Sequence, residues 1–458
     1  MACEWTTARL SERYEFSSGL SKPRSEFGFG YCFLTFKDVL DNYFVPDALS
    51  ALVNSTEKDR TSCSVKRGDV FLTRTSETQH ELGMSCVALK DYESATFNGF
   101  TKRLRPKPNT NIVPEYAAYF FRGPQFRRDV TAMSSLSTRA SLNNEMLTRL
   151  NIVLPPVEVQ HAIGRILKTL DDKIELNRRM NETLEGLARA IFQSWFVDFD
   201  PVRAKLDGSP PAAFDPTTAA LFPEHLEDSP LGKKPIGWLV TALDNVLAVL
   251  ETGGRPKGGV GGITSGVPSI GAESIVSVGI FDFGKTKFVP VEFHEGMRKG
   301  HIQSHDVLLY KDGGRPGEYE PHVSMFGDGF PFEKCSINEH VYRLRTNERL
   351  SQEYLYFWMT SEFALAEMRI KGTGVAIPGL NSTAVRSLAV LVPPRPIVEA
   401  FTRQAAPLIT RLLANAKQSR TLAAIRDALL PKLLSGEIRV AEGERLVEEA
   451  NSTTNTHF

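Results

Sequence analysis

The sequence predicts an α+β fold: two similar mixed domains separated by two long antiparallel coiled-coil helices. Three observations support this prediction: motifs of the first half recur in the second, a long heptad pattern follows each copy, and a proline-rich stretch lies between the halves. A chain of 458 residues is long enough for two or three domains. The expected segments are a first mixed domain (1–155), a helix (156–200), a linker (201–234), a second mixed domain (235–393), a second helix (394–436) and a disordered tail (437–458).

The repeat is an ordered series of matches. The Leu142-Asn143 pair and the run from Leu150 to Pro156 recur 238 residues later, as Leu380-Asn381 and the run from Leu388 to Pro394. Further matches, in which the offset drifts from 238 to 233, are Glu115-Tyr116 with Glu353-Tyr354, Asp69 to Leu72 with Asp306 to Leu309, and Trp5, Leu10 and Pro23 with Trp238, Leu243 and Pro256. Small loop insertions produce such drift, so the series indicates duplication.

Each mixed domain contains short apolar runs separated by glycine, proline and asparagine, a pattern typical of α+β structure. The runs from Asp69 to Thr73 and from Asp306 to Tyr310 are predicted to be buried strands.

The two helices are predicted from apolar residues that alternate in steps of four and three. Each helix would run for about 35–40 residues, or about 55 Å at 1.5 Å per residue. The first seam consists of Ile163, Leu167, Leu170, Ile174, Asn177, Asn181, Leu184, Ala188, Ile191 and Trp195. The second, which departs from the pattern at Arg426, consists of Phe401, Ala405, Leu408, Leu412, Asn415, Ser419, Leu422, Arg426, Leu429 and Leu433.

Both seams become polar at their centres. If the helices pair antiparallel about their midpoints, Asn177 falls near Ser419 and Asn181 near Asn415. Polar seam residues penalise slipped registers, so we expect these four to fix the register of a spacer. The alternative is ordinary core packing that tolerates the asparagines.

Two stretches lack a long helical pattern. Residues 201–235 hold seven prolines, which exclude a continuous helix and favour an extended linker. After Gly436 the chain becomes acidic and ends in small polar residues, which favours a frayed tail.

Composition indicates a protein of the cytoplasm. The five cysteines are scattered without Cys-x-x-Cys spacing, which favours reduced thiols. The sequence shows neither a signal peptide nor an apolar run long enough for a membrane span. Net charge is zero, from 54 basic and 54 acidic residues, so any nucleic-acid surface must gather its positive charge locally.

Four segments carry a family resemblance. The run from Leu154 to Gln160 (LPPVEVQ) resembles the entry to a conserved helix of type I restriction-modification specificity subunits, and the run from Arg189 to Lys205 (RAIFQSWFVDFDPVRAK), followed by Gly208, resembles their central conserved region. Pro235 to Trp238 resembles the start of their second target-recognition domain, and Leu429 to Glu437 the end of their second conserved helix. The run from Pro393 to Glu399 departs from the pattern because it lacks the Glu-Gln pair, so the two helix entries need not contact partners identically.

The resemblance covers nearly the whole chain and implies a non-catalytic DNA-recognition subunit of a prokaryotic cell. Each target-recognition domain would read one half of a split target in double-stranded DNA, and the helices would be spacer and docking surface for two methyltransferase subunits. With restriction subunits added, the assembly would be an ATP-dependent endonuclease. S-adenosylmethionine and ATP would be used by those partners, and no cofactor or metal would be bound by this chain.

Candidate DNA contacts follow from residue chemistry, because lysine and arginine bind phosphates and read base edges. Residues 102–139 hold eight basic and two acidic side chains, although such a run can also be a solvated face. Arg74 and Lys311 follow the two predicted strands at equivalent positions, and loops after strands often carry function. Lys22 and Arg255 likewise precede equivalent prolines. The full candidate set is Lys22, Arg74, Lys102, Arg103, Arg105, Lys107 and Arg139 in the first half, and Arg255, Lys311, Arg315, Lys371 and Thr373 in the second.

Two motifs suggest other chemistry. Residues 279–286 (GIFDFGKT) match the phosphate-binding P-loop pattern, but bulky residues and a following β-type run predict a hairpin. His294, His301 and His305 could suggest a metal, yet the strand predicted from Asp306 opposes a helical pair. The rival functions are therefore a P-loop ATPase or cryptic methylase, and a coiled-coil adaptor that never touches DNA.

Overall fold

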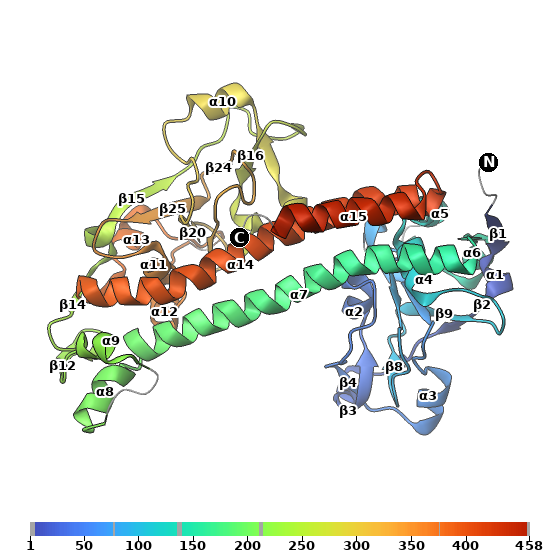
Figure 1. Ribbon diagram of the computed structural model, residues 1–458, viewed down its shortest axis with the longest axis horizontal. Helices are drawn as coiled ribbons and strands as arrows, with labels where there is room; N and C mark the ends of the chain where they lie inside the picture. The colour runs from blue at the N-terminus through green and yellow to red at the C-terminus, as the bar shows by residue number, and fades with distance from the viewer. Residues whose placement is uncertain (1–4, 77, 135–139, 210–213, 375, 456–458) are drawn as a thin grey trace. The chain divides into compact units, whose positions relative to one another are not determined.

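The computed structural model describes residues 5–76, 78–134, 140–209, 214–374 and 376–455 (Figure 1). By its internal contacts the chain divides into two compact units: unit 1 is 1–174 with 421–458, and unit 2 is 175–420. Each unit therefore combines one mixed domain with parts of both long helices.

Unit 1 is built around a four-stranded sheet of order β2-β9-β5-β7 and a three-stranded sheet of order β4-β3-β8. Its strands are β1 (Thr6–Arg9), β2 (Tyr14–Ser18), β3 (Phe27–Leu34), β4 (Leu52–Val53), β5 (Val70–Thr73), β6 (Thr75–Ser76), β7 (Ser85–Val87), β8 (Thr96–Phe97), β9 (Thr101–Pro106), β10 (Ala140–Ser141) and β11 (Asn151–Leu154). Its short helices are α1 (Leu10–Arg13), α2 (Phe36–Asp41), α3 (Glu57–Ser62), α4 (Pro114–Arg122), α5 (Pro124–Ser134) and α6 (Asn144–Arg149).

Unit 2 contains a four-stranded sheet of order β15-β25-β20-β23 and a three-stranded sheet of order β19-β16-β24. Its strands are β12 (Leu226–Ser229), β13 (Gly232–Pro235), β14 (Leu239–Ala242), β15 (Leu247–Thr252), β16 (Val267–Ile270), β17 (Ile275–Ser277), β18 (Ile280–Phe281), β19 (Lys287–Val289), β20 (Val307–Tyr310), β21 (Gly314–Arg315), β22 (Glu318–Tyr319), β23 (Val323–Met325), β24 (Ser336–Ile337), β25 (Val341–Thr346) and β26 (Ala389–Val392). Its short helices are α8 (Asp200–Leu206), α9 (Pro216–Ala220), α10 (Val291–Gly296), α11 (Gln352–Met359), α12 (Glu362–Lys371) and α13 (Ser382–Arg386).

The two four-stranded sheets have the same connectivity. In each, the first strand along the chain pairs with the last, the last pairs with the second, and the second pairs with the third. Register also matches, because Val70 of β5 lies opposite Leu104 and Val307 of β20 lies opposite Leu344. All four residues of β5 and the first three of β20 are buried, which confirms the two strand predictions.

The long helices are α7 (Val157–Phe196) and α14 (Arg395–Ser435). Within unit 1, Asp171 of α7 forms an ion pair with Arg426 of α14 at 2.6 Å. Within unit 2, the ring of Phe192 lies 5.8 Å from the ring of Phe401. Because Asn177 of α7 also meets Ser419 of α14 in this unit, later residues of α7 meet earlier residues of α14, and the helix segments of unit 2 are antiparallel.

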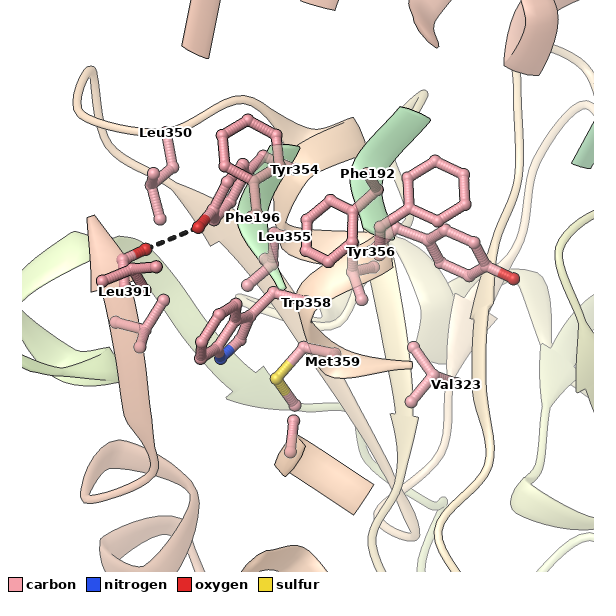
Figure 2. Close-up of a cluster of buried hydrophobic side chains, with 14 of the residues drawn as sticks. Phe192, Phe196, Val323, Leu350, Tyr354, Leu355, Tyr356, Trp358, Met359 and Leu391 are labelled. Carbon is pink, nitrogen blue, oxygen red and sulfur yellow. Dashed lines mark hydrogen bonds between the residues drawn. The ribbon is translucent and has the colours of Figure 1, made fainter. Parts of the chain in front are cut away.

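The core of unit 2 contains aromatic residues of α7. Figure 2 shows Phe192 and Phe196 packed among side chains of α11, including Tyr354. The Tyr354 hydroxyl donates a hydrogen bond of 2.7 Å to the Leu391 carbonyl, which ties α11 to β26. These aromatic residues of the 189–205 motif thus build the core of unit 2.

Two segments differ from prediction. The expected extended linker at 201–234 contains α8, α9 and an antiparallel β12–β13 pair. The expected disordered tail contains α15 (Val440–Asn455), in which Val447 is 6% exposed within the core of unit 1. Packing of a few apolar side chains supplies the order that composition did not indicate.

Candidate nucleic-acid interface

In unit 1, three chain segments meet where β5 ends and β9 begins. The Arg74 amide donates a hydrogen bond of 2.8 Å to the Phe100 carbonyl. The Leu142 amide in turn donates to the Arg74 carbonyl, also at 2.8 Å. The repeated Leu-Asn motif therefore has a local role: it joins the segment before α6 to the end of the sheet.

Unit 2 repeats this arrangement. The Lys311 amide donates to the His340 carbonyl at 2.9 Å, and the Leu380 amide donates to the Lys311 carbonyl at 2.8 Å. The strand-end position that holds Arg74 in unit 1 therefore holds Lys311 in unit 2, within the same backbone scaffold.

Charged side chains form a network at the strand end of unit 2. Arg255 pairs with Glu339 at 2.9 Å, and Nε2 of His340 lies 3.4 Å from the same carboxylate. His340 also contacts Asp312 through Nδ1 at 2.8 Å, and Lys311 lies 3.7 Å from Asp312. The structure thus brings together Arg255 and Lys311, two of the predicted DNA contacts, on one partly exposed surface.

Two predicted cations of unit 1 are paired or buried. Lys22 pairs with Asp59 at 3.0 Å. Lys102 is only 7% exposed and donates to Ser18 and Asn144 at 2.9 and 2.8 Å. Burial, and to a smaller extent the charge of Arg74, lowers the pKa of the Lys102 ammonium.

The described part of the basic run, residues 102–134, does not form a free cationic face. Arg103 donates to the Ser64 carbonyl, Arg105 makes a two-point contact with Asp69 at 2.7 and 2.6 Å, and Lys107 donates to the Ser11 carbonyl. Other arginines of the run bind loop carbonyls: Arg122 contacts those of Ser85, Val39, Leu40 and Asn42, and Arg127 contacts those of Leu82 and His80. A count of charges along the sequence does not reveal these contacts. Buried backbone carbonyls need hydrogen-bond donors, and here basic side chains supply them.

The remaining candidates are dispersed. Arg315 is exposed in β21 and has no ion-pair partner among the residues that the structure describes. Lys371 contacts Glu367 at 3.0 Å and Ser387 at 2.8 Å, and Thr373 exchanges backbone hydrogen bonds with Gly379. Arg139 lies outside the described residues.

One repeated motif escaped the sequence reasoning. Arg103-Leu104-Arg105 recurs as Arg343-Leu344-Arg345, 240 residues later, on the equivalent strands β9 and β25. In both units an arginine of this motif binds a fully buried aspartate, Asp69 in unit 1 and Asp306 in unit 2. The identical letters were the available signal, and they mark a structural anchor at the opposite end of the strands from Arg74 and Lys311.

The predicted polar layer of the helices lies within unit 2. Nδ2 of Asn177 donates to the Ser419 hydroxyl at 3.2 Å, and Nδ2 of Asn415 donates to Oδ1 of Asn181 at 3.0 Å. Asn177 also donates to Gln418, which the sequence reasoning did not include, at 2.8 Å. These are the pairings that the antiparallel register requires.

The structure explains the two motifs that suggested other chemistry, the P-loop-like run 279–286 and the three histidines. Residues 279–286 contain β18 and a short 3-10 turn at Phe283–Lys285, and β18 pairs with β17 as a hairpin. His294 and His301 lie with ring centroids 4.7 Å apart, whereas His305 binds Glu353 at 2.9 Å. The three histidines therefore do not meet at one site. The residues that the structure describes contain no group of three or more side chains suited to a metal ion.

Among the helices in the described ranges, none is both long and apolar enough to cross a lipid bilayer.

Comparison with known proteins shows which proteins the chain resembles. Residues 4–186 match the type I restriction modification DNA specificity domain. The chain is 25% identical over 452 residues to the specificity subunit of the type I restriction enzyme MjaIX of Methanocaldococcus jannaschii, covering 96% of this chain and 94% of that one. It is also 25% identical over 449 residues to the HindI specificity subunit of Haemophilus influenzae, covering 89% and 94%.

The fold agrees with these matches. The crystal structure of the S subunit of a type I restriction-modification system from M. genitalium covers 94% of this chain and 96% of its own, with a TM-score of 0.52 and 12% identity. Residues 4–186 thus match the DNA specificity domain of type I restriction-modification systems, and over nearly its whole length the chain is similar to specificity subunits of such systems.

Proposed function

We propose that this protein reads a split DNA target, with one half-site recognised by each unit. The observation that carries the proposal is the shared scaffold: the same sheet connectivity and the same strand-end hydrogen bonds occur in both units, around different exposed side chains. Two copies of one reading domain, arisen by duplication, fit a target of two unlike halves. Loops held by a rigid scaffold are common binding sites.

We further propose that α7 and α14 form an antiparallel coiled-coil spacer, whose register is fixed by the polar layer of Asn177, Asn181, Asn415 and Ser419. A helix of about 40 residues is about 60 Å long, which exceeds one turn of DNA, about 34–36 Å. The spacer would hold the two reading surfaces on separate grooves.

The chain itself is proposed to be non-catalytic and to bind no cofactor. Its relatives are named specificity subunits, and the exposed faces of the long helices offer a docking surface for two methyltransferase subunits. S-adenosylmethionine would be bound by those subunits and ATP by restriction subunits. The setting would be the cytoplasm of a prokaryotic cell, where these partners meet DNA.

The test uses the chain assembled with its methyltransferase subunits. We expect the assembly to retain DNA and to transfer methyl groups in a sequence-dependent way, with no activity from the chain alone. Retention that ignores sequence would reject the reading function, and ATP hydrolysis by the isolated chain would favour an ATPase.

Lys311→Ala tests the strand-end surface in the same assay. Loss of this cation should weaken DNA retention and relax the reading of one half-site only. A Lys234→Ala change is a matched control, because Lys234 pairs with Glu227 within the β12–β13 hairpin. Equal retention and equal sequence preference in the two variants would remove Lys311 from the interface.

A further inference from the structure

The loop between β8 and β9 is rigid, yet it exposes a large apolar side chain. The Asn98 side chain accepts a hydrogen bond of 2.7 Å from the Phe100 amide, and the Asn98 carbonyl accepts one of 2.6 Å from the Thr101 hydroxyl. With the contact from Arg74, these bonds fix the backbone on both sides of Phe100, whose side chain is nevertheless 64% exposed.

Neighbouring glycines hold this loop against the start of the domain. The Gly99 amide donates to the Leu20 carbonyl at 2.9 Å, and a Cβ on Gly99 would lie 2.3 Å from the Ser21 hydroxyl. A Cβ on Gly19 would lie 2.2 Å from the Asn98 carbonyl oxygen. The approach at Gly19 is to backbone and admits only glycine, and it places the Phe100 loop beside the segment that leads to Lys22.

Unit 2 contains the same loop with a different, partly exposed side chain. The Asn338 side chain accepts from the His340 amide at 2.8 Å, as Asn98 does from Phe100. Gly253 approaches this loop as Gly19 approaches the other, since its added Cβ would lie 1.5 Å from the Ile337 carbonyl oxygen. The scaffold is therefore shared, whereas the residue that it presents changes from phenylalanine to histidine.

A single exposed phenylalanine is ordinary on a protein surface. What distinguishes Phe100 is its place: a fixed loop next to a strand-end cation, at the position where the other unit presents a polar ring. We propose that Phe100 and His340 are equivalent specificity-determining residues, one for each half-site. This inference rests on the proposed reading of a split target.

The two side chains would read different base features. The Phe100 ring can contact the methyl group of thymine, the apolar feature of the major groove. His340 is oriented through Nδ1 by Asp312, and its Nε2 lies 3.4 Å from Glu339, longer than a good hydrogen bond. Because Nδ1 donates its proton to the Asp312 carboxylate, Nε2 of the neutral ring is placed to accept from a base-edge donor such as adenine N6 or cytosine N4.

The experiment measures methylation of a library of duplexes by the complex of this chain with its methyltransferase subunits. Phe100→Ala should reduce discrimination at one base pair of one half-site by about tenfold, within the range of a single base contact. His340→Ala should do the same in the other half-site and leave the first unchanged. Phe100→His is the second variant, and it should shift the preferred base at the Phe100 position.

Phe29→Ala is the matched control, because Phe29 is a 51% exposed phenylalanine of the same unit that lies on β3. The inference is overturned if Phe100→Ala keeps the parent motif while the parent complex methylates a split target, or if Phe29→Ala relaxes the motif equally. A parent complex that methylates without sequence preference would instead defeat the proposed function, and this inference with it.

Discussion

At the scale of single residues, a buried carboxylate anchors the four-stranded sheet of each unit. Asp306 is fully buried and forms ion pairs with Arg343 and Arg345. Its carboxylate also accepts a hydrogen bond of 2.6 Å from the Gln303 amide. Arg343 is 8% exposed as a side chain. Removing the shared carboxylate would leave guanidinium charge in a poorly solvated place, which is costly.

We therefore expect Asp306→Ala to lower the free energy of unfolding of unit 2 by about 3–5 kcal/mol, the usual cost of breaking a buried ion pair. Denaturant titration followed by tryptophan fluorescence would measure this change. Asp228→Ala is the control: Asp228 is 91% exposed opposite Lys233 and should have no measurable effect. Comparable losses in the two variants would contradict the anchoring role.

The contact between Glu353 and His305 predicts that the stability of unit 2 depends on pH. Burial is the largest single influence and raises the pKa of Glu353, but hydrogen bonds from His305, from the backbone and from Ser351, together with the charge of His305, outweigh it and hold the pKa below its usual value. A carboxylate with a lowered folded-state pKa stabilises the protein above its unfolded pKa, about 4.3. This stabilisation is lost as the pH falls from there through the folded-state pKa.

Glu353→Gln should remove this contribution. Denaturation midpoints measured from pH 6 down to about pH 3 should fall more steeply for the parent than for the variant, with the difference arising below the usual glutamate pKa, about 4.3. Parallel curves would show that the Glu353 carboxylate does not titrate as proposed.

Residue types and repeats indicated equivalent positions in the two units better than they indicated which side chains are free. The strand-end pair of Arg74 and Lys311 could be found from the repeat because duplicated scaffolds keep equivalent positions. The internal contacts of Arg103 and Arg105 could not, because their partners Ser64 and Asp69 come from other parts of the fold.

At the scale of elements, the heptad pattern correctly predicted the two long helices, α7 and α14, because periodicity depends on local sequence alone. Its one break, Arg426, is explained by two contacts: an ion pair with Asp171, and a ring contact with Tyr43 at 5.2 Å. Prolines misled the linker prediction because Pro201 and Pro216 lie in the first turns of α8 and α9, where a missing amide costs little.

Cysteine crosslinking tests the helix register. Cysteines replacing Asn177 and Ser419 should form a disulfide rapidly under mild oxidation, because the native side chains already touch. A pair of cysteines that replace Leu184 and Ser419, displaced by one heptad, should not form a disulfide rapidly. Faster bridging of the displaced pair would contradict the antiparallel register, and each single-cysteine variant would serve as background for the native thiols.

At the scale of the whole molecule, two features combine. The two units offer the same strand-end scaffold with different exposed residues, and the two helices contribute to both units. The sequence repeat predicted this organisation because duplication leaves matches that need no knowledge of packing. The recognised bases could not be predicted, because no code links residues to bases in such domains.

The central claim is that the helices set the distance between two independent readers. Insertion of one heptad after Leu184 and one before Leu412 keeps the proposed facing register and lengthens both helices by about 10 Å at 1.5 Å per residue. The most direct measurement is sequencing of methylated DNA for the parent and the lengthened complexes. We predict two unchanged half-sites whose gap widens by about three base pairs, at 3.4 Å each, and an unbroken motif or an unchanged gap would contradict the account.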